Sequence, residues 1–219
     1  PPRRCSPWQL AQCCWYSDRM AAVLGAWAVA RVLAPRSKAA REVRRMTSKN
    51  IAACAGGVGV KARLDHESVG TSSITRRLDE LGFDYIEGGY PASNDKDFEY
   101  FQKVNELNLR AAQIVAFGMT RRKGIDVKDD AGLRALLESK TPVITIVGKA
   151  SAFQAEEVLR TTREENLRMI AETIEYLRGH GREVIFDAEH FFDGYKYDAD
   201  YALTTVRIAA EAGAKTIVL

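Results

Sequence analysis

The stretch REVIFDAEHFFDGYK, residues 182–196, begins as a buried strand and ends in a cluster of charged side chains. Its apolar start is typical of a core strand, and three acids and an imidazole follow within a few positions. Successive side chains of a strand point to opposite faces. Ile185, Asp187 and Glu189 therefore share one face, and the alternate apolar residues share the other. We expect the apolar face to lie against a layer of helices.

Four further segments have the character of the same strand. They are FDYIEGGY (83–90), AAQIVAFG (111–118), TPVITIVG (141–148) and KTIVL (215–219). Runs of Val and Ile, rather than clean alternation, are typical of strands that are covered on both faces, as in a parallel sheet. The five strands recur every 30–40 residues or so, which is the length of a β-α unit. The sequence therefore predicts an α/β fold with right-handed crossovers.

Helical patterns fill the intervals between these strands. Ile74, Leu78 and Leu81 fall on one helical face, before a stop at Gly82. Asn94 is placed to cap the next helix. Further helices are indicated before the strands at 141–148, 183–189 and 215–219. Two closures remain open, an open doubly wound sheet or part of a (β/α)8 barrel, which needs eight strands and about 250 residues.

In either closure, functional residues gather at the carboxyl ends of the strands. Glu87 ends the first predicted strand, Lys149 follows the third, and Asp187 and Glu189 end the fourth. A carboxylate facing into a barrel mouth can act as a base or a metal ligand, and we favour that role for Glu189 over a salt bridge to a helix. His190 is expected to face away from Glu189.

Cationic side chains at two strand ends allow other chemistry. Lys149 could form a Schiff base with a carbonyl substrate, although a solvated or anion-contacting lysine is the commoner case. Arg121, Arg122 and Lys123 could meet a phosphorylated cofactor, or they could simply form a hydrated loop.

The first 54 residues differ from the rest. They hold ten Lys/Arg and two acids, which leaves 22 basic and 27 acidic residues for 55–219 out of totals of 32 and 29. The body is therefore acidic and predicts no nucleic-acid partner. We divide the chain into a non-conforming basic head, 1–54, and a body, 55–219. All four cysteines lie in the head, so the body fits a reducing compartment.

The head allows several interpretations. Its apolar run from Met20 to Ala30 is shorter than the ~20 residues that span a bilayer, so no membrane partner is expected. It could be an organelle transit peptide or a non-native stretch. We predict a cytoplasmic protein, or one of an organelle matrix or stroma if the head is a transit peptide. Gly57-x-Gly59 has the form of a dinucleotide-binding turn, which is a weaker hypothesis than a flexible junction.

Four stretches of the body resemble the citramalate synthase branch of the isopropylmalate synthase and pyruvate carboxyltransferase-like family. They are LDELGFDYIEGGYPASN (78–94), AFGMTRRKG (116–124), VLRTTREENLRMI (158–170) and GREVIFDAEHFFDGYK (181–196). The resemblance runs from about Arg77 to Leu219. It implies a TIM barrel, of which this chain holds about five β-α units.

The resemblance also implies an activity. Acetyl-CoA would be condensed with a 2-oxo acid, pyruvate giving citramalate, in branched-chain amino-acid biosynthesis, with 2-isopropylmalate synthesis as the near neighbour. Glu189 matches the family's catalytic glutamate, Glu87 an acidic position that supports an active-site arginine, and Asp187 joins them as a substrate-binding candidate. A divalent ion, Mg or Mn, and a homodimer are implied for an intact parent, whose partners are small molecules.

The chain also departs from the family pattern. An Asp-Thr-Thr-Leu-Arg-Asp-Gly-like first strand and a His-x-His pair are not found in the sequence, and Gln154 stands where many relatives have His. No metal ligand can therefore be transferred. We expect a fragment that is inactive by itself. The alternatives are a non-catalytic truncated paralogue that acts in binding or assembly, and a nucleotide-binding α/β domain that uses the Gly57 turn.

Overall fold

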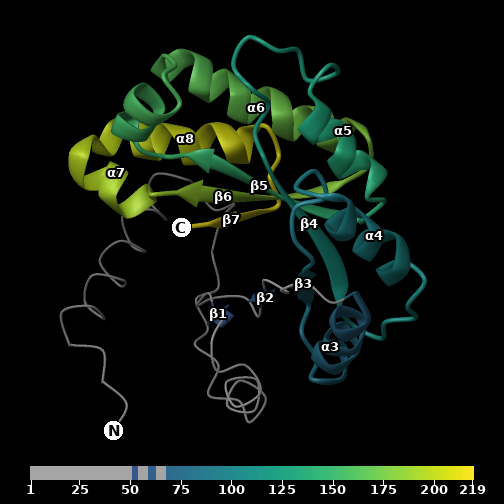
Figure 1. Cartoon of the computed structure of the whole chain (residues 1–219). Coiled ribbons are helices and arrows are strands. Elements are labelled where there is room, and N and C mark those ends of the chain that lie inside the picture. The colour runs from purple at the N-terminus through teal and green to yellow at the C-terminus, as the bar shows by residue number, and fades with distance from the viewer. Residues whose placement is uncertain (1–50, 54–58, 63–67) are drawn as a thin grey trace, which may run out of the picture. The chain divides into compact units, whose positions relative to one another are not determined.

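The computed structural model describes residues 51–53, 59–62 and 68–219, which form one sheet with helices packed along it (Figure 1). The Met20–Ala30 run, the cysteines and Gly57 lie outside the described residues, and so does most of the predicted head. Among the described helices, none is both long and apolar enough to cross a membrane.

The helices and strands follow one another in a regular alternation. In chain order they are β1 Ile51–Ala53, β2 Gly59–Ala62, α3 Ser68–Glu80, β3 Tyr85–Glu87, α4 Asp95–Val104, β4 Gln113–Met119, α5 Ala131–Glu138, β5 Val143–Lys149, the π-helix η2 Gln154–Val158, α6 Arg163–Gly179, β6 Glu183–Glu189, α7 Phe191–Tyr197, α8 Ala199–Glu211 and β7 Thr216–Val218.

The strands lie in the sheet in the order of the sequence, from β1 to β7. β1 pairs antiparallel with β2, and every later neighbouring pair is parallel. β3 to β7 are the five predicted strands, so the predicted α/β fold, a partial parallel barrel, is confirmed. β1 and β2 are two short strands that no sequence pattern indicated.

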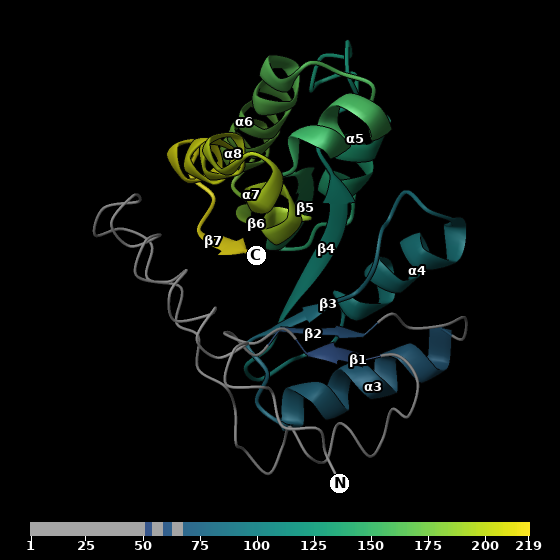
Figure 2. The ribbon, with the colours of Figure 1, turned by 90° about the vertical axis from the view of Figure 1, so that its left-hand side faces the viewer.

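The two faces of the sheet have different roles. Ile146 and Phe186 are fully buried on the face that the helices cover, and a side chain at Gly118 or Gly148 would collide with that layer. In Figure 2 the described helices lie on the outer side of the curving strands. On the inner face, a cluster of Val115, Val143 and Ile185 is buried, with Tyr85 and Val218 packed against it. The strand alternation predicted around Ile185 is confirmed.

Helix α3 buries only part of the apolar face that was predicted for it. Ile74 is 38% exposed, whereas Leu78 and Asp79 are buried. The Asp79 carboxylate accepts hydrogen bonds of 2.8–2.9 Å from the backbone N–H groups of residues 110–112, just before β4. Burial alone would raise the pKa of Asp79, but these three donors together hold that pKa below its ordinary value. A polar anchor therefore takes part of the face assigned to Ile74.

Helix termini follow the predicted signals. Asn94 Oδ1 accepts the Asp97 N–H at 2.9 Å and so caps α4. Gly82, the predicted stop after α3, adopts a φ of 78°, which suits a residue without Cβ. Two short helices, η2 and α7, follow the carboxyl ends of β5 and β6. The sequence pattern predicted neither of them, and both border the residues described next.

Candidate functional site

The carboxyl ends of β5 and β6 bring together the residues singled out by the sequence. The register pairs Val147 with Asp187, and Lys149 with Glu189. All four belong to the inner face, because they alternate with the buried residues of the helix face. The structure therefore places Asp187 and Glu189 on the predicted face, and it adds Lys149 directly beside Glu189.

Lys149 and Glu189 form an ion pair, in which the Lys149 ammonium donates to Glu189 Oε2. The lysine side chain is only 13% exposed, whereas the glutamate is 37% exposed and can be reached from solvent. Because its amino group is engaged with a carboxylate, Lys149 is not free to attack a carbonyl. This arrangement weighs against the Schiff-base hypothesis and makes Lys149 a support for Glu189.

A buried asparagine holds the backbone at this point. Asn166 Nδ2, on α6, donates to the Lys149 carbonyl at 2.8 Å and to the Tyr201 hydroxyl of α8 at 2.8 Å. The Asn166 side chain is fully buried, so these bonds tie the end of β5 to two helices. Sequence reasoning missed Asn166, although a polar residue among the apolar positions of a core helix is a signal that could have found it.

His190 does not face away from Glu189 as expected. The strand ends at Glu189, and His190 takes the left-handed conformation, with a φ of 61°, at the start of α7. Its Nε2 lies 3.9 Å from Glu189 Oε1. The alternation rule fails here because it holds only within a strand, and the turn brings the imidazole back toward the carboxylate.

Glu87 occupies the inner face at the end of β3. The register pairs it with Val115 of β4, Val115 with Val143 of β5, and Val143 with Glu183. Across the sheet, Glu87 is thus level with Glu183, the first residue of β6, whereas Glu189 is the last residue of that strand. The register therefore does not bring Glu87 beside Glu189. A substrate-binding role for Glu87 stays a prediction.

The loop that follows β4 is fastened to α6 by Arg121. Its Nε donates to Glu172 Oε2 at 2.6 Å and its Nη1 to Glu165 Oε1 at 2.8 Å. Its backbone N–H donates to Thr173 Oγ1 at 2.9 Å. Burial would lower the pKa of Arg121, but the two glutamates raise it above its ordinary value. Arg121 is therefore a buried structural cation and not part of a hydrated loop.

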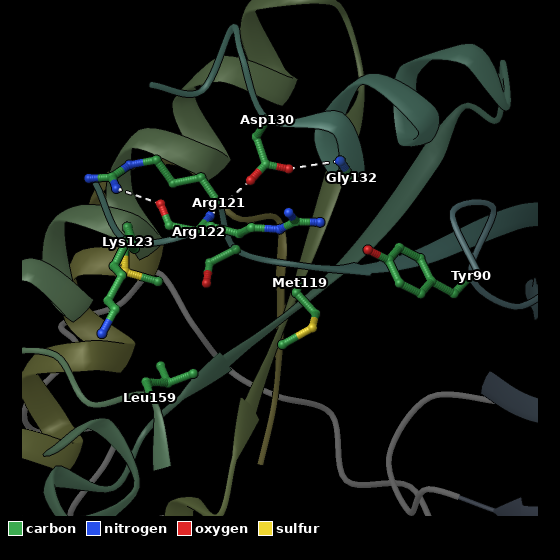
Figure 3. Close-up of a pocket in the computed structure, with 10 residues that line it drawn as sticks. Tyr90, Met119, Arg121, Arg122, Lys123, Asp130, Gly132 and Leu159 are labelled. Carbon is green, nitrogen blue, oxygen red and sulfur yellow. Dashed lines mark hydrogen bonds between the residues drawn. The ribbon is translucent and has the colours of Figure 1, made fainter. Parts of the chain in front are cut away.

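A pocket of about 220 Å³ opens beside this loop (Figure 3). Its lining residues are Tyr90, Met119, Thr120, Arg121, Arg122, Lys123, Asp130, Gly132, Leu159 and Met169. Figure 3 shows the Arg122 guanidinium and the Tyr90 hydroxyl pointing toward each other from opposite walls, while the Lys123 side chain runs away from Tyr90. The pocket thus presents hydrogen-bond donors from two different loops.

The metal site that the resemblance implies does not fit the residues that the structure describes. Among them, no three His, Cys, Asp or Glu side chains lie close enough together to hold a metal ion. Gln154, which stands where relatives have His, begins η2. The described residues therefore do not supply a ligand set for the ion.

The family comparison covers most of the chain. Residues 61–219 match the family described as HMGL-like. The (R)-citramalate synthase of Aquifex aeolicus is 48% identical over 146 residues, which are 67% of this chain and 28% of the relative. The (R)-citramalate synthase of Streptomyces coelicolor is 47% identical over 148 residues, 67% of this chain and 28% of the relative. The 2-isopropylmalate synthase of Sulfolobus acidocaldarius is 34% identical over 146 residues, 66% of this chain and 34% of the relative. The chain thus spans 28–34% of the length of these three relatives.

Solved structures show the same fold at low identity. The hydroxymethylglutaryl-CoA lyase of Pseudomonas aeruginosa aligns with a TM-score of 0.54 and 17% identity, over 71% of this chain and 51% of that one. The HMG-CoA lyase of Bacillus subtilis aligns with a TM-score of 0.55 and 12% identity, over the same shares. At these identities the likeness concerns the arrangement of strands and helices alone.

Proposed function

Because the chain belongs to the HMGL-like family, we propose that it forms part of an acyltransferase that condenses acetyl-CoA with a 2-oxo acid. Pyruvate is the proposed acceptor and citramalate the product. Two relatives named (R)-citramalate synthase, at 48% and 47% identity, support this choice. Relatives named 2-isopropylmalate synthase and homocitrate synthase reach 34% and 32%.

The observation that carries the proposal is the position of Glu189. Its carboxylate ends β6 on the inner face, remains accessible to solvent, and is paired with Lys149. A carboxylate in this place can take a proton from the methyl group of acetyl-CoA, which is a very weak acid and needs a positioned base. The carbanion then forms a carbon–carbon bond to the carbonyl carbon of the 2-oxo acid. That carbonyl oxygen takes up a proton, and water hydrolyses the thioester to release CoA.

Lys149 is the proposed support for this base. It binds one oxygen of Glu189, Oε2, whereas Oε1, which lies 3.9 Å from His190 Nε2, is the oxygen proposed to take the proton. Asp187, two residues earlier on the same face, and Glu87 are the proposed substrate-binding acids. A divalent ion, Mg or Mn, and a homodimeric assembly belong to the same proposal, with the ligands of the ion supplied from outside the described residues.

A chimera tests the function directly. The part of the Aquifex aeolicus (R)-citramalate synthase that matches this chain is replaced by the matching residues of this chain. The chimera is assayed for release of CoA from acetyl-CoA, with pyruvate or with 2-oxoisovalerate as the acceptor. The unaltered Aquifex enzyme is the control for folding and metal loading.

We expect turnover with pyruvate and little with 2-oxoisovalerate. Preference for 2-oxoisovalerate would favour the 2-isopropylmalate synthase alternative. A chimera that folds like its parent but has no activity would favour the alternative in which this chain acts only in binding or assembly.

A further inference from the structure

The three consecutive cations after β4 have three different roles. Arg121 is buried between Glu165 and Glu172 of α6. Lys123 Nζ donates to the carbonyl of Arg160 at 2.8 Å, beyond η2. These two contacts anchor the loop on either side of Arg122, whose side chain is directed into the pocket (Figure 3).

The backbone of Arg122 is also held in place by a hydrogen bond. Its N–H donates to Asp130 Oδ2 at 2.9 Å, while Asp130 Oδ1 accepts the N–H groups of Gly132 and Leu133 at the start of α5. The buried Asp130 carboxylate is therefore satisfied by three backbone donors. Its charge is balanced by the end of a helix, whereas the exposed Arg122 side chain can be reached by a ligand from solvent.

On the opposite wall of the pocket, Gly132 leaves room for the Tyr90 hydroxyl because glycine has no side chain. A Cβ at Gly132 would lie 3.0 Å from the Tyr90 hydroxyl and 3.1 Å from Asp130 Oδ1. Without it, the Tyr90 hydroxyl can approach α5 and face Arg122. A guanidinium fork and a phenolic hydroxyl that converge on one space are suited to an oxyanion, which the fork can bind through two parallel bonds.

The size of the pocket limits the ligand to one group. Pockets for drug-sized molecules have volumes of about 300–1,000 Å³, and this one has about 220 Å³. It can hold a single phosphate or carboxylate with part of what carries that group, but not a whole nucleotide cofactor. Its floor is apolar, because Met119, Leu159 and Met169 line it.

The proposed reaction offers two oxyanions, the carboxylate of the 2-oxo acid and the phosphates of acetyl-CoA, and the position of the pocket favours one of them. Met119 of the pocket pairs with Val147, which pairs with Asp187. Neighbouring strands lie about 4.7–4.9 Å apart, so Met119 and Asp187 are separated by about 10 Å. A 2-oxo acid carboxylate must lie within a bond or two of the carbon that is attacked beside Glu189, whereas Arg122 is an exposed residue three positions beyond the end of β4. The phosphates of acetyl-CoA lie at the far end of its pantetheine arm and can span this interval.

We propose that the pocket between Tyr90 and Arg122 binds a phosphate group of acyl-CoA, with Arg122 as the charged ligand and Tyr90 as the second donor. This proposal rests on the proposed function, because that function supplies the acyl-CoA. It gives this chain a role in holding the donor substrate, in addition to carrying the base.

The test is a ³¹P NMR titration of CoA with the 219-residue chain, because the 3′-phosphate and the diphosphate have separate resonances. We expect selective broadening of one of these resonances. Arg122→Gln should weaken binding about 10- to 100-fold, the worth of a hydrogen bond to a charged group. Arg122→Lys keeps the charge but loses the two parallel hydrogen-bond donors. Its affinity for CoA should therefore lie between those of the original chain and Arg122→Gln. Arg134→Gln, which removes an exposed charge from α5 outside the pocket, is the matched control and should bind like the original chain.

Two further ligands identify the group that is recognised. Pantetheine lacks phosphate, so its binding should not depend on Arg122. Pyruvate should not compete with the broadened phosphate. Circular dichroism of each variant establishes that it is folded. The proposal is overturned if the folded chain broadens neither resonance, if Arg122→Gln binds CoA as tightly as the original chain, or if pyruvate displaces CoA.

The phosphate site and the acyltransferase activity can be tested separately. In the Aquifex chimera, Arg122→Gln should raise the KM for acetyl-CoA and leave the KM for pyruvate unchanged. An active chimera with an unchanged KM for acetyl-CoA would refute the phosphate site and leave the acyltransferase assignment standing. An inactive chimera would count against the acyltransferase, while the NMR titration would still decide the site.

Discussion

At the scale of single residues, the proposed chemistry depends on one carboxylate oxygen of Glu189. Replacing Glu189 with Gln keeps the shape of the side chain but removes the basic oxygen. In the active chimera we expect kcat to fall about 10²- to 10⁴-fold, the usual worth of general acid–base catalysis. The KM for pyruvate should change little, because the glutamate acts on the other substrate. Steady-state kinetics measures both, and an unchanged kcat would move the assignment to Asp187 or His190.

A second residue, Asp79, predicts how stability depends on pH. Because three backbone donors hold its pKa below the ordinary value, its contribution is complete above the unfolded-state pKa of about 3.9 and is lost as the pH falls through the lower pKa of the folded state. Asp79→Asn should lower the free energy of unfolding at pH 7 by about 1–3 kcal/mol, because a donor group then meets backbone N–H groups. The difference should shrink below about pH 4.

Urea denaturation at several pH values tests this prediction. The exposed Asp84→Asn is the control, with the same charge change and no expected effect at either end of the range. If the free energies of unfolding of the original chain and Asp79→Asn differ by the same amount from neutral to acidic pH, the proposed origin of the stabilisation is contradicted.

The sequence could predict on which face of a strand a residue lies, but not the contacts between residues. The periodicity of β6 correctly gave the facing of Asp187 and Glu189. The pairing of Lys149 with Glu189 depends on the register between two strands 40 positions apart, which no local pattern encodes. His190 was misplaced because one left-handed residue ends the alternation, and His can adopt that conformation without a sequence signal as clear as glycine.

At the scale of elements, Gly194 fixes how closely α7 can approach the end of β5. A Cβ there would lie 2.5 Å from the Ala150 carbonyl oxygen and 2.8 Å from Ser151 Cα. Backbone atoms cannot move aside as a flexible side chain does, so Gly194→Ala should destabilise the chain by about 1–3 kcal/mol. Gly179→Ala, at the end of α6 with nothing within 4 Å, is the control. It should be neutral or stabilising by up to about 1 kcal/mol. Thermal denaturation of both variants gives the comparison, and equal melting temperatures would contradict it.

Three of the five strands that the sequence revealed are long, whereas β3 and β7 have three residues each. β4, β5 and β6 contain seven residues each and carry clear apolar runs. β1 and β2 have three and four residues, too few to show a strand period, and they pair with each other. Ile74 matched the helical period but is exposed, whereas Asp79, which is not part of the apolar pattern, is buried and accepts backbone N–H groups. A hydrogen bond of this kind, between distant parts of the chain, produces no periodic pattern in the sequence.

At the scale of the molecule, β7 lies at one edge of the described sheet. Parallel edge strands offer unpaired backbone groups to other chains, and Leu219 beside this edge is 42% exposed. We predict that the 219-residue chain associates in solution. Sedimentation velocity should show species larger than a monomer, and Thr216→Lys, which places a charge on the exposed edge, should reduce them. A monomer over a wide concentration range would refute the prediction.

The anchoring of the loop after β4 also determines what a protease can cut. Arg121, Arg122 and Lys123 offer trypsin three consecutive peptide bonds, and trypsin must take the basic side chain into its own acidic pocket. The guanidinium of Arg121 is already held by Glu165 and Glu172, and the N–H groups of Arg121 and Arg122 are bonded to Thr173 and Asp130. Limited digestion followed by mass spectrometry should therefore leave this loop intact while other exposed basic sites are cut. Arg121→Gln should make cleavage after Arg122 rapid, because the segment can then detach from α6 and enter the protease as an extended chain.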